Sequence, residues 1–386
     1  MRGEEGHHPG ESHLWPFLRH RSSKRRVGVE HDRSTRGSVL GRRLSALIRQ
    51  HQALALPGHG ETLARFRILA DIAEEDLSLG KLFESHADAL AILSELNERI
   101  RFAPDLRWTV WCAELPSHRL RFTPLSEGRV RIDGSKAFAS GFAFLTHALV
   151  SGFGPEGERL LAAVELSDPG LSPISGGFYA AGMSATETVD LEFDGVEGTL
   201  IGPPSAYLER PGFLYGAAGV AACWFGGARA ILKIVHSLLE RRRGAPQLAK
   251  PDTKDGSKNK TEGAKERPRL HHEHAQLGSL DIELSAAASA LREAAEAIDA
   301  CASPQDAAPL PKLEIMRARL STERACESII TRAPRMTGAG PLCRDIALDR
   351  TLNDLRIYIR QSHAERDLEA HGETLSALEG GSLWRL

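Results

Sequence analysis

The chain has 386 residues, 41% of them hydrophobic, a size that predicts two or three packed units rather than one small core. Its 49 basic and 51 acidic residues nearly cancel, which excludes a general charge-driven affinity for nucleic acid or anionic membranes. The five cysteines are widely spaced and form no C-x-x-C pair, so we expect a reducing, cytoplasmic environment rather than a secreted disulfide scaffold.

Residues 1–45 are rich in Arg and His and lack the apolar core of a secretory signal, so they are predicted to be a disordered basic leader. An organelle transit peptide and a nucleic-acid-binding arm are the alternatives, and Glu4, Glu5 and Glu11 argue against the first. The longest apolar run, from Phe213 to Phe225, is shorter than the roughly 20 residues that span a bilayer. No membrane span is therefore expected.

Residues 46–107 are predicted to form an N-terminal helical domain. Apolar residues recur there at steps of three and four, as in Leu63, Phe66 and Leu69, which is typical of amphipathic helices with one buried face. A turn between two such helices is expected from Asp76 to Gly80, with Ser78 as its candidate N-cap.

Residues 108–205 are predicted to form a β domain, either a compact barrel or a sandwich. Short apolar stretches alternate there with Gly, Pro, Ser and Asp turns. Near the end of the block, Val189, Leu191 and Phe193 alternate with acidic residues, the pattern of a strand with one wet face.

Residues 206–386 return to helical periodicity and are predicted to form a C-terminal bundle. A Gly- and Ala-rich helix runs from Phe213 to Arg243, and three more helical stretches follow near 272–301, 312–333 and 344–370. Residues 244–270 contain almost nothing apolar and are expected to be a flexible insertion. This order predicts an α+β architecture, and without a G-x-G-x-x-G after a strand a nicotinamide site has no support.

Two strings within the β block carry a family resemblance: 134–141 (Gly-Ser-Lys-Ala-Phe-Ala-Ser-Gly) and 182–188 (Gly-Met-Ser-Ala-Thr-Glu-Thr). A β block holding them between long alanine-rich helices resembles the middle domain of the acyl-CoA dehydrogenase family of flavoproteins, over roughly residues 46–372. The resemblance implies flavin adenine dinucleotide (FAD) bound between the β domain and the C-terminal bundle, in a homotetramer.

The resemblance also implies which residues approach the flavin ring. Cys112 and Ala113 begin a Cys-Ala-Glu-Leu-Pro stretch that stands where the family has Thr-Glu-Pro, with Ala113 in place of a hydroxyl. Phe138 and Ser140 match the aromatic residue and the hydroxyl of the family's Gly-x-Lys-x-Trp-Ile-Thr, which lie against the ring and near its reactive nitrogen. Without the family, Phe138 is a core aromatic residue and Ser140 a turn residue.

Three further residues are implied to lie at the far end of the cofactor. Glu240 and Arg241 match the family's Glu-Arg pair, whose Arg reaches the cofactor diphosphate in a neighbouring subunit. Gly338 and Gly340 stand in the family's Gly-Gly-x-Gly turn, whose amides approach a phosphate or adenine. A solvated cation at a helix end and an ordinary helix-ending turn are the alternatives.

The position of the catalytic base departs from the family pattern. Where dehydrogenases of this family carry a glutamate, after an Arg-Asp pair matched here by 344–345, this chain has Asn353 and Asp354. Asp354 is the nearest carboxylate, one position displaced and one methylene shorter, and is the candidate base for α-proton removal. A surface or capping role for Asp354 is the alternative.

The favoured function is that of an FAD-dependent, acyl-CoA dehydrogenase-like oxidoreductase that acts on the CH-CH group of an acyl thioester. Its partners would be acyl-CoA or another small-molecule substrate and an electron acceptor. The first alternative is a flavin-dependent monooxygenase served by a flavin reductase, in which Ser140 and His363 stabilise the hydroperoxide. The second is an inactive family member with a structural role.

Two patterns are given no catalytic role. His271 and His274 lie at i, i+3, but the sequence shows no further ligand cluster beside them, so no metal is proposed. Cys112 has no motif that places a His with it, and we interpret its thiol as a packing group.

Overall fold

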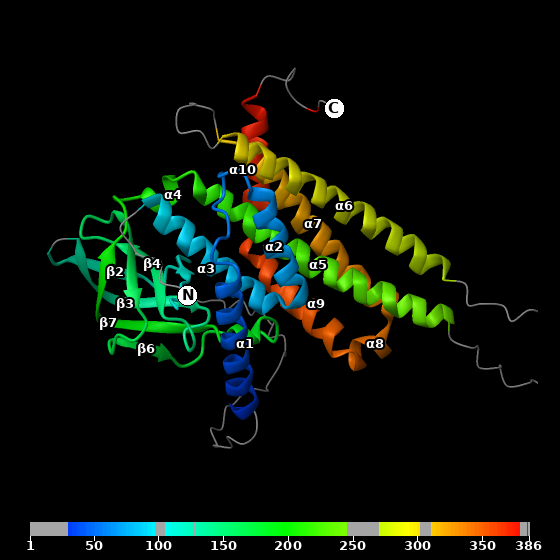
Figure 1. Ribbon diagram of the computed structural model, residues 1–386, viewed down its shortest axis with the longest axis horizontal. Helices are drawn as coiled ribbons and strands as arrows, with labels where there is room; N and C mark the ends of the chain where they lie inside the picture. The colour runs from blue at the N-terminus through cyan, green and yellow to red at the C-terminus, as the bar shows by residue number, and fades with distance from the viewer. Residues whose placement is uncertain are drawn as a thin grey trace, which may run out of the picture.

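The computed structural model of the chain describes residues 30–96, 105–126, 128–244, 270–301, 310–378 and 384. Helices lead into a central β domain, and a helical bundle follows it, in the order that the sequence predicts. In Figure 1 the β domain lies on the left and the long helices of the bundle extend to the right. The predicted α+β architecture is confirmed.

The N-terminal part consists of α1 (Glu30–Gln50), α2 (Thr62–Glu75) and α3 (Leu77–Leu96). On α1, Leu40, Leu44 and Ile48 repeat at steps of four and are buried, so this face of the helix packs against the hydrophobic core. Helix α1 therefore begins before residue 46, inside the segment expected to be a leader. The rest of that segment, 1–29, lies outside the described residues.

The turn between α2 and α3 is tighter than predicted. Asp76 alone separates the two helices, and its Oδ1 accepts the Leu79 backbone N–H at 3.1 Å. The cap is therefore Asp76 and not Ser78, which lies buried inside α3. Helices α2 and α3 approach so closely there that a Cβ on Gly80 would come within 2.7 Å of Ala73.

The β domain is a barrel. Its strands are β1 (Val110–Trp111), β2 (Leu120–Pro124), β3 (Arg129–Ala139), β4 (His147–Phe153), β5 (Arg159–Glu165), β6 (Leu171–Ile174) and β7 (Val189–Leu200), with the short helix η1 (Ser184–Thr186) before β7. Pairing runs from β4 through β2, β3, β7 and β5 and back to β4, which closes the ring. Buried side chains such as Phe122, Ile132 and Phe193 fill its interior.

Strand β3 is irregular where it pairs with β7, and this irregularity shapes the site. Its register shifts between Ile132 and Gly134 and again between Lys136 and Ala139. Gly134 has a φ of 119°, and a Cβ on it would lie 2.3 Å from the Arg119 carbonyl oxygen. Only glycine fits this close approach of two strands.

The C-terminal part comprises α4 (Ala206–Glu209), α5 (Gly212–Gly244), α6 (His271–Ala300), α7 (Lys312–Thr337), α8 (Ala339–Arg344), α9 (Ile346–Tyr358), η2 (Ile359–Gln361) and α10 (Glu365–Ser376). The helical stretch predicted for 344–370 is thus interrupted: Ser362 is extended, and Ala364 has a φ of 44°. The predicted insertion at 244–270 falls almost entirely on 245–269, outside the described residues.

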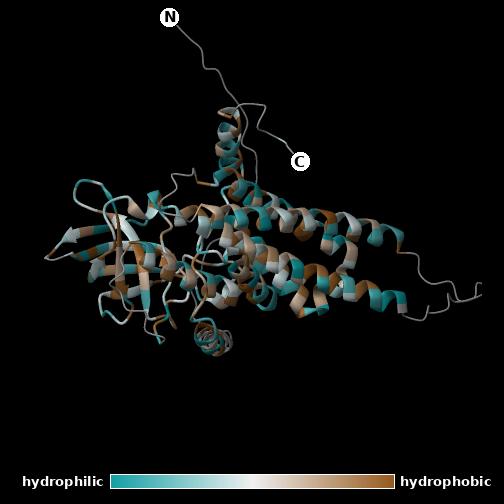
Figure 2. Ribbon diagram, turned by 45° about the horizontal axis from the view of Figure 1, so that its top comes forward, coloured by the Kyte–Doolittle hydropathy of each residue, from teal (hydrophilic) through white to brown (hydrophobic). Residues whose placement is uncertain are grey.

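Helix α5 runs through the middle of the bundle. It is long and apolar enough to cross a bilayer, yet 61% of its most apolar window is buried by neighbouring helices. In Figure 2 hydrophobic residues concentrate where the bundle helices face one another. The apolar surface of α5 is accounted for by the core of the bundle, so its composition is weak evidence for a membrane span.

Candidate functional site

Two of the family-like segments, the Cys-Ala-Glu-Leu-Pro stretch at 112–116 and the string at 134–141, lie side by side at one end of the barrel. The Trp111 indole Nε1 donates to the Ser140 carbonyl oxygen at 3.2 Å. Lys136 is fully buried, and its ammonium lies 2.8 Å from Glu114 Oε1 and 2.9 Å from the Ser151 carbonyl oxygen. Lys136 of the 134–141 string therefore anchors the loop that contains the 112–116 stretch.

Phe138 occupies the second register shift of β3 in a strained conformation. Its φ is 61°, which is uncommon for a bulky residue, and its backbone N–H donates to Asp190 Oδ1 at 3.0 Å. The ring is 46% exposed instead of lying in the barrel core. An aromatic ring held rigidly at the surface provides a flat apolar face, which fits a planar cofactor such as a flavin.

Ser140 is buried and hydrogen-bonded to other hydroxyls. Its Oγ lies 2.8 Å from Thr188 Oγ1, which lies 2.8 Å from Thr186 Oγ1, and the Thr186 hydroxyl donates to the Met183 carbonyl at 2.7 Å. Met183 in turn donates its backbone N–H to Asp354 Oδ1 at 2.5 Å. A continuous chain of contacts through η1 thus connects the predicted flavin hydroxyl with the predicted base.

Asp354 is held in a structural environment between α9 and η1. Arg350 lies 3.4 Å from its Oδ2, and burial raises the pKa of the carboxyl while the Met183 N–H and Arg350 oppose that rise. Asp354 lines a pocket of about 270 Å³ together with Ser184 and residues of α8 and α9. A Cβ on Gly182 would lie 2.0 Å from the Asn353 carbonyl oxygen, so the segment just before η1 is packed directly on α9. The role of Asp354 as base stays a prediction.

A larger cavity of about 480 Å³, which we call the central cavity, lies between α3, β1, α5, α7 and the segment before α10. Cys112, Ala113 and His363 all line it. Phe138, Ser140 and Asp354 do not belong to its lining. The structure therefore brings together the first signature and the histidine of the monooxygenase alternative, and it places the candidate base in a different pocket.

Burial raises the pKa of the Cys112 thiol to about 11. The thiol is therefore protonated at neutral pH and unreactive, which supports its interpretation as a packing group.

The α3 face of the central cavity carries three ionisable residues that the sequence does not single out: Lys81, Glu84 and Asp88. Glu84 is 7% exposed, and burial, with Asp88 adding to it, raises its pKa to about 8. Burial also raises the pKa of Asp88 and lowers that of Lys81. Within the described ranges no hydrogen-bond partner contacts the Glu84 carboxyl, so it is available to a ligand.

The sequence does contain a pattern that could have identified Lys81, Glu84 and Asp88. Three charged residues at positions i, i+3 and i+7 form a polar stripe on a helix that is otherwise strongly apolar. A stripe of this kind on a buried helix indicates a cavity or a partner, but only the packing of α5 and α7 decides which.

Two arginines fix the walls of the central cavity. Arg210 donates to Glu95 Oε2 at 2.9 Å and lies 3.8 Å from Asp88. Arg319 donates to the Ala217 carbonyl at 3.2 Å and to the Gln361 carbonyl at 2.7 Å, which joins α5, α7 and η2. These contacts join the elements around the cavity, whose lining combines charged residues with apolar ones such as Leu214 and Val220.

The residues predicted for the far end of the cofactor lie elsewhere. Arg242 donates to the Met336 carbonyl at 2.9 Å, which brings exposed Arg241 to the same end of the bundle as Gly338 and Gly340. Gly338 has a φ of 76°, and a Cβ on either glycine would meet nothing within 4 Å. In Figure 1 this end, near α8, lies away from the β domain. In one chain these residues do not meet Phe138 or Ala113.

In the part of the chain that the structure describes, no three His, Cys, Asp or Glu residues gather as metal ligands do. His271 and His274 lie in the exposed first turn of α6.

Comparisons with solved structures place this arrangement in a known fold. FMN-bound TdsC from Paenibacillus sp. A11-2, a dibenzothiophene monooxygenase, is 19% identical, with a TM-score of 0.67 over 89% of this chain and 97% of its own. Butyryl-CoA dehydrogenase from Megasphaera elsdenii is 15% identical, with a TM-score of 0.65 over 92% and 100%. Methanesulfinate monooxygenase MsuC from Pseudomonas fluorescens is 15% identical, with a TM-score of 0.64 over 88% and 96%.

No protein-family model matches the chain, and no curated protein matches it. The chain has the fold of the acyl-CoA dehydrogenases and of the monooxygenases built on the same plan, as the resemblance implied. At these identities the likeness shows the fold alone.

Proposed function

We propose that this protein is a flavin-dependent oxidoreductase that carries out its reaction in the central cavity. The observation that carries the proposal is the position of Ala113, which lines this cavity while its loop is anchored to β3 by the Lys136 to Glu114 contact. That contact places the cavity wall next to the strand that presents the exposed ring of Phe138. Bound flavin would supply two-electron redox chemistry.

The chain's own residues would hold the flavin from two sides. Phe138 offers an apolar face for its ring, and the backbone at Cys112 and Ala113 borders the cavity. Because Arg241 lies at the far end of the bundle, it would reach the diphosphate of a cofactor in a neighbouring copy, as Gly338 and Gly340 would. We therefore propose FAD and a homo-oligomer, in line with the expected homotetramer.

We assign proton transfer to Glu84. A carboxyl with a pKa of about 8 changes its protonation state near neutral pH, which is what a general acid or base requires. Its side chain faces the central cavity with no hydrogen-bond partner among the described residues.

Of the two reactions left open by the sequence, the monooxygenase reaction is favoured by the lining of the central cavity. Lys81, Asp88 and Arg210 border it beside apolar residues, and these charged groups suit a small substrate with a polar group better than a wholly apolar fatty acyl chain. His363 reaches the same cavity, whereas Asp354 does not. In this reaction a separate reductase supplies electrons, one oxygen atom enters the substrate and the other leaves as water.

Dehydrogenation of an acyl thioester is the second candidate, and Glu84 is the observation that favours it. A buried carboxylate of raised pKa is the base that removal of an α-proton needs. In that case the substrate would be an acyl-CoA with a short, polar acyl group.

Flavin titration of the purified full-length protein tests the proposal. We expect FAD to bind, and we expect Phe138→Ala to weaken binding about tenfold, or about 1.4 kcal/mol. Tyr179→Ala is the matched control because Tyr179 is an aromatic residue that is 90% exposed and does not line the central cavity. A protein that takes up neither FAD nor FMN would disprove the proposal.

Reduction of the oxidised, flavin-loaded protein then separates the two reactions. Bleaching of the flavin by acyl-CoA without oxygen supports the dehydrogenase. Bleaching only by NADH with a flavin reductase, followed by oxygen uptake that depends on a small polar substrate, supports the monooxygenase.

A further inference from the structure

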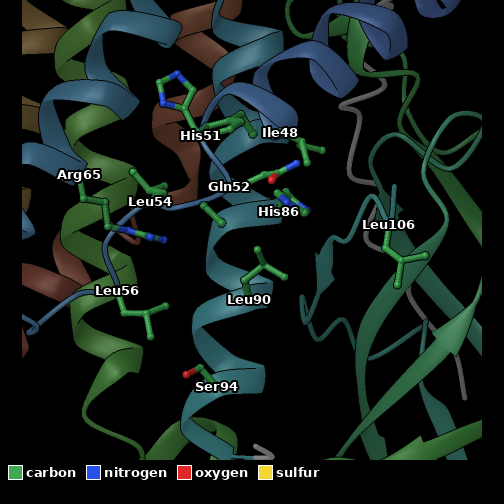
Figure 3. A pocket seen from close by; sticks show the side chains of 12 residues that line it. Ile48, His51, Gln52, Leu54, Leu56, Arg65, His86, Leu90, Ser94 and Leu106 are labelled. Carbon is green, nitrogen blue, oxygen red and sulfur yellow. The ribbon is translucent and has the colours of Figure 1, made fainter. Parts of the chain in front are cut away.

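A second cavity, which we call the helical pocket, lies on the other side of α3 from the central cavity. It has a volume of about 390 Å³ and is bounded by the end of α1, the segment 51–56, α2, α3 and Leu106 (Figure 3). Helix α3 contributes Phe83, Ala87 and Leu90 to it, whereas Lys81 and Glu84 line the central cavity. The two cavities are therefore separate sites that share one helix.

The walls of the helical pocket are mostly apolar. Ile48, Leu54, Leu56 and Leu90 are among its lining residues, and they come from three different elements. Empty apolar cavities are destabilising, because their walls lose packing contacts. A volume of about 390 Å³ lies within the range of small-molecule sites.

Arg65 supplies the charge of the helical pocket. It is 5% exposed, and among the described residues its only hydrogen bond is from Nη1 to the Ala55 carbonyl at 3.0 Å. No carboxylate among them lies within 4 Å of its guanidinium. Figure 3 shows the side chain reaching from α2 between Leu54 and Leu56 toward α3. A guanidinium can make five hydrogen bonds, so most of this donor capacity is unused.

The other titratable groups of the helical pocket do not compensate this charge. Burial lowers the pKa of His86 to about 4, so the ring is neutral, and its Nδ1 accepts the Trp108 backbone N–H at 3.1 Å. His51 packs edge-on against Phe83, and burial lowers its pKa as well. Asp88 and Glu84 attract Arg65 only from a longer distance, and their own pKa values are raised by burial. The helical pocket is therefore apolar with one buried cation.

We propose that the helical pocket binds a small monocarboxylic acid with an apolar body, whose carboxylate pairs with Arg65 and whose body packs among Leu54, Leu56 and Leu90. A planar guanidinium matches a carboxylate through two parallel hydrogen bonds. The leucines offer apolar contact to the rest of the molecule. This site requires neither a flavin nor the reaction proposed for the central cavity.

Isothermal titration of the full-length protein with octanoate tests the proposal, with 1-octanol as the ligand that lacks the charge. We expect octanoate to bind more tightly than octanol. Arg65→Met should weaken octanoate binding by at least about 30-fold and leave octanol binding nearly unchanged. Arg65→Lys should keep part of the affinity, because it retains the charge without the two-pronged geometry.

Two cavity-filling variants locate the binding site. Leu90→Trp fills the helical pocket and should abolish octanoate binding, whereas Met316→Trp fills the central cavity and should leave it unchanged. Thermal melting verifies that each variant is folded, and Arg65→Lys serves if Arg65→Met is not. The proposal is overturned if the wild type does not bind octanoate, if octanol binds as well, or if Met316→Trp alone abolishes binding.

Discussion

The ammonium of Lys136 lies 2.8 Å from Glu114 Oε1, with a lysine side chain that is fully buried and a glutamate side chain that is 24% exposed. Ser151 adds its carbonyl as a second acceptor at 2.9 Å. The contact joins the loop that carries Ala113, which lines the central cavity, to the strand that carries Phe138.

The unequal burial of the two partners predicts unequal costs of mutation. Glu114→Ala leaves a buried ammonium without its counter-ion and should lower the free energy of unfolding by about 3 kcal/mol. Lys136→Met leaves a carboxylate that water can reach and should cost about 1 kcal/mol. Urea denaturation measures both. Arg129→Ala breaks an exposed ion pair between Arg129 of β3 and Glu197 of β7, and its cost should stay within about 0.5 kcal/mol. Equal costs for Glu114→Ala and Lys136→Met would contradict this assignment.

Gly182 is predicted to tolerate no side chain. A Cβ there would lie 2.0 Å from the Asn353 carbonyl oxygen, so Gly182→Ala should push the segment before η1 away from α9 and cost about 1–3 kcal/mol. Gly278→Ala is the matched control, since a Cβ on Gly278 in α6 meets nothing within 4 Å and should stabilise the helix by about 0.5–1 kcal/mol. Thermal unfolding compares the two, and similar melting temperatures would show that the segment at Gly182 is not packed tightly on α9.

His86 is predicted to make the protein sensitive to acid. Its pKa is about 4 when folded and about 6.5 when unfolded, so the unfolded chain binds the proton first as the pH falls. Stability is therefore lost from about pH 6.5 downward, by up to about 3 kcal/mol near pH 4. His86→Asn keeps an acceptor for the Trp108 N–H without a titrating ring. Its stability should fall less over this range, and an unchanged pH dependence would contradict the prediction.

Glu84 is predicted to have the opposite effect at higher pH. Its pKa is raised to about 8, so between about pH 4.5 and 8 the unfolded chain is ionised while the folded protein keeps the proton. Stability should therefore fall as the pH rises through this window. Glu84→Gln should gain a few kcal/mol relative to wild type at pH 8 and little at pH 4.5. Urea denaturation at both values measures the difference, and a constant offset between the two proteins would refute the assignment.

The same variant separates a structural role of Glu84 from a chemical one. If Glu84 transfers a proton in the reaction, Glu84→Gln should also remove the activity transition near pH 8, while flavin affinity stays within about twofold. A variant that is more stable and equally active would remove Glu84 from the reaction.

Periodicity and turn residues predicted most of the architecture. Apolar spacing of three and four identified α2, α3, α5, α6 and α7, because a helix that docks on one face must repeat its apolar residues with the helical turn. Gly, Pro, Ser and Asp turns marked the breaks between the short strands of the β domain for the same local reason. The break at Ser362 in the last helical stretch was missed because the positive φ of Ala364 is maintained by contacts with α7, such as that of Ser362 with Glu323.

The conformation and exposure of Phe138 could not be predicted from its neighbours in the sequence. Its neighbours in sequence describe a buried strand residue, yet Asp190, some fifty positions away, holds its backbone in a left-handed conformation that turns the ring outward. Lys136 is the converse case, a charged residue that Glu114 and Ser151 allow to be buried.

The amino-acid sequence by itself determined the order of the layers, the resemblance of the β block and the presence of the Gly134 and Lys136 signature, since these follow from local periodicity and residue type. Only the tertiary structure decided that Glu84 faces a cavity, that Asp354 lies outside it and that Arg65 is buried with no carboxylate within 4 Å among the described residues. The physical reason is that pKa, exposure and pairing depend on groups brought together from distant elements, and a linear pattern does not contain those distances.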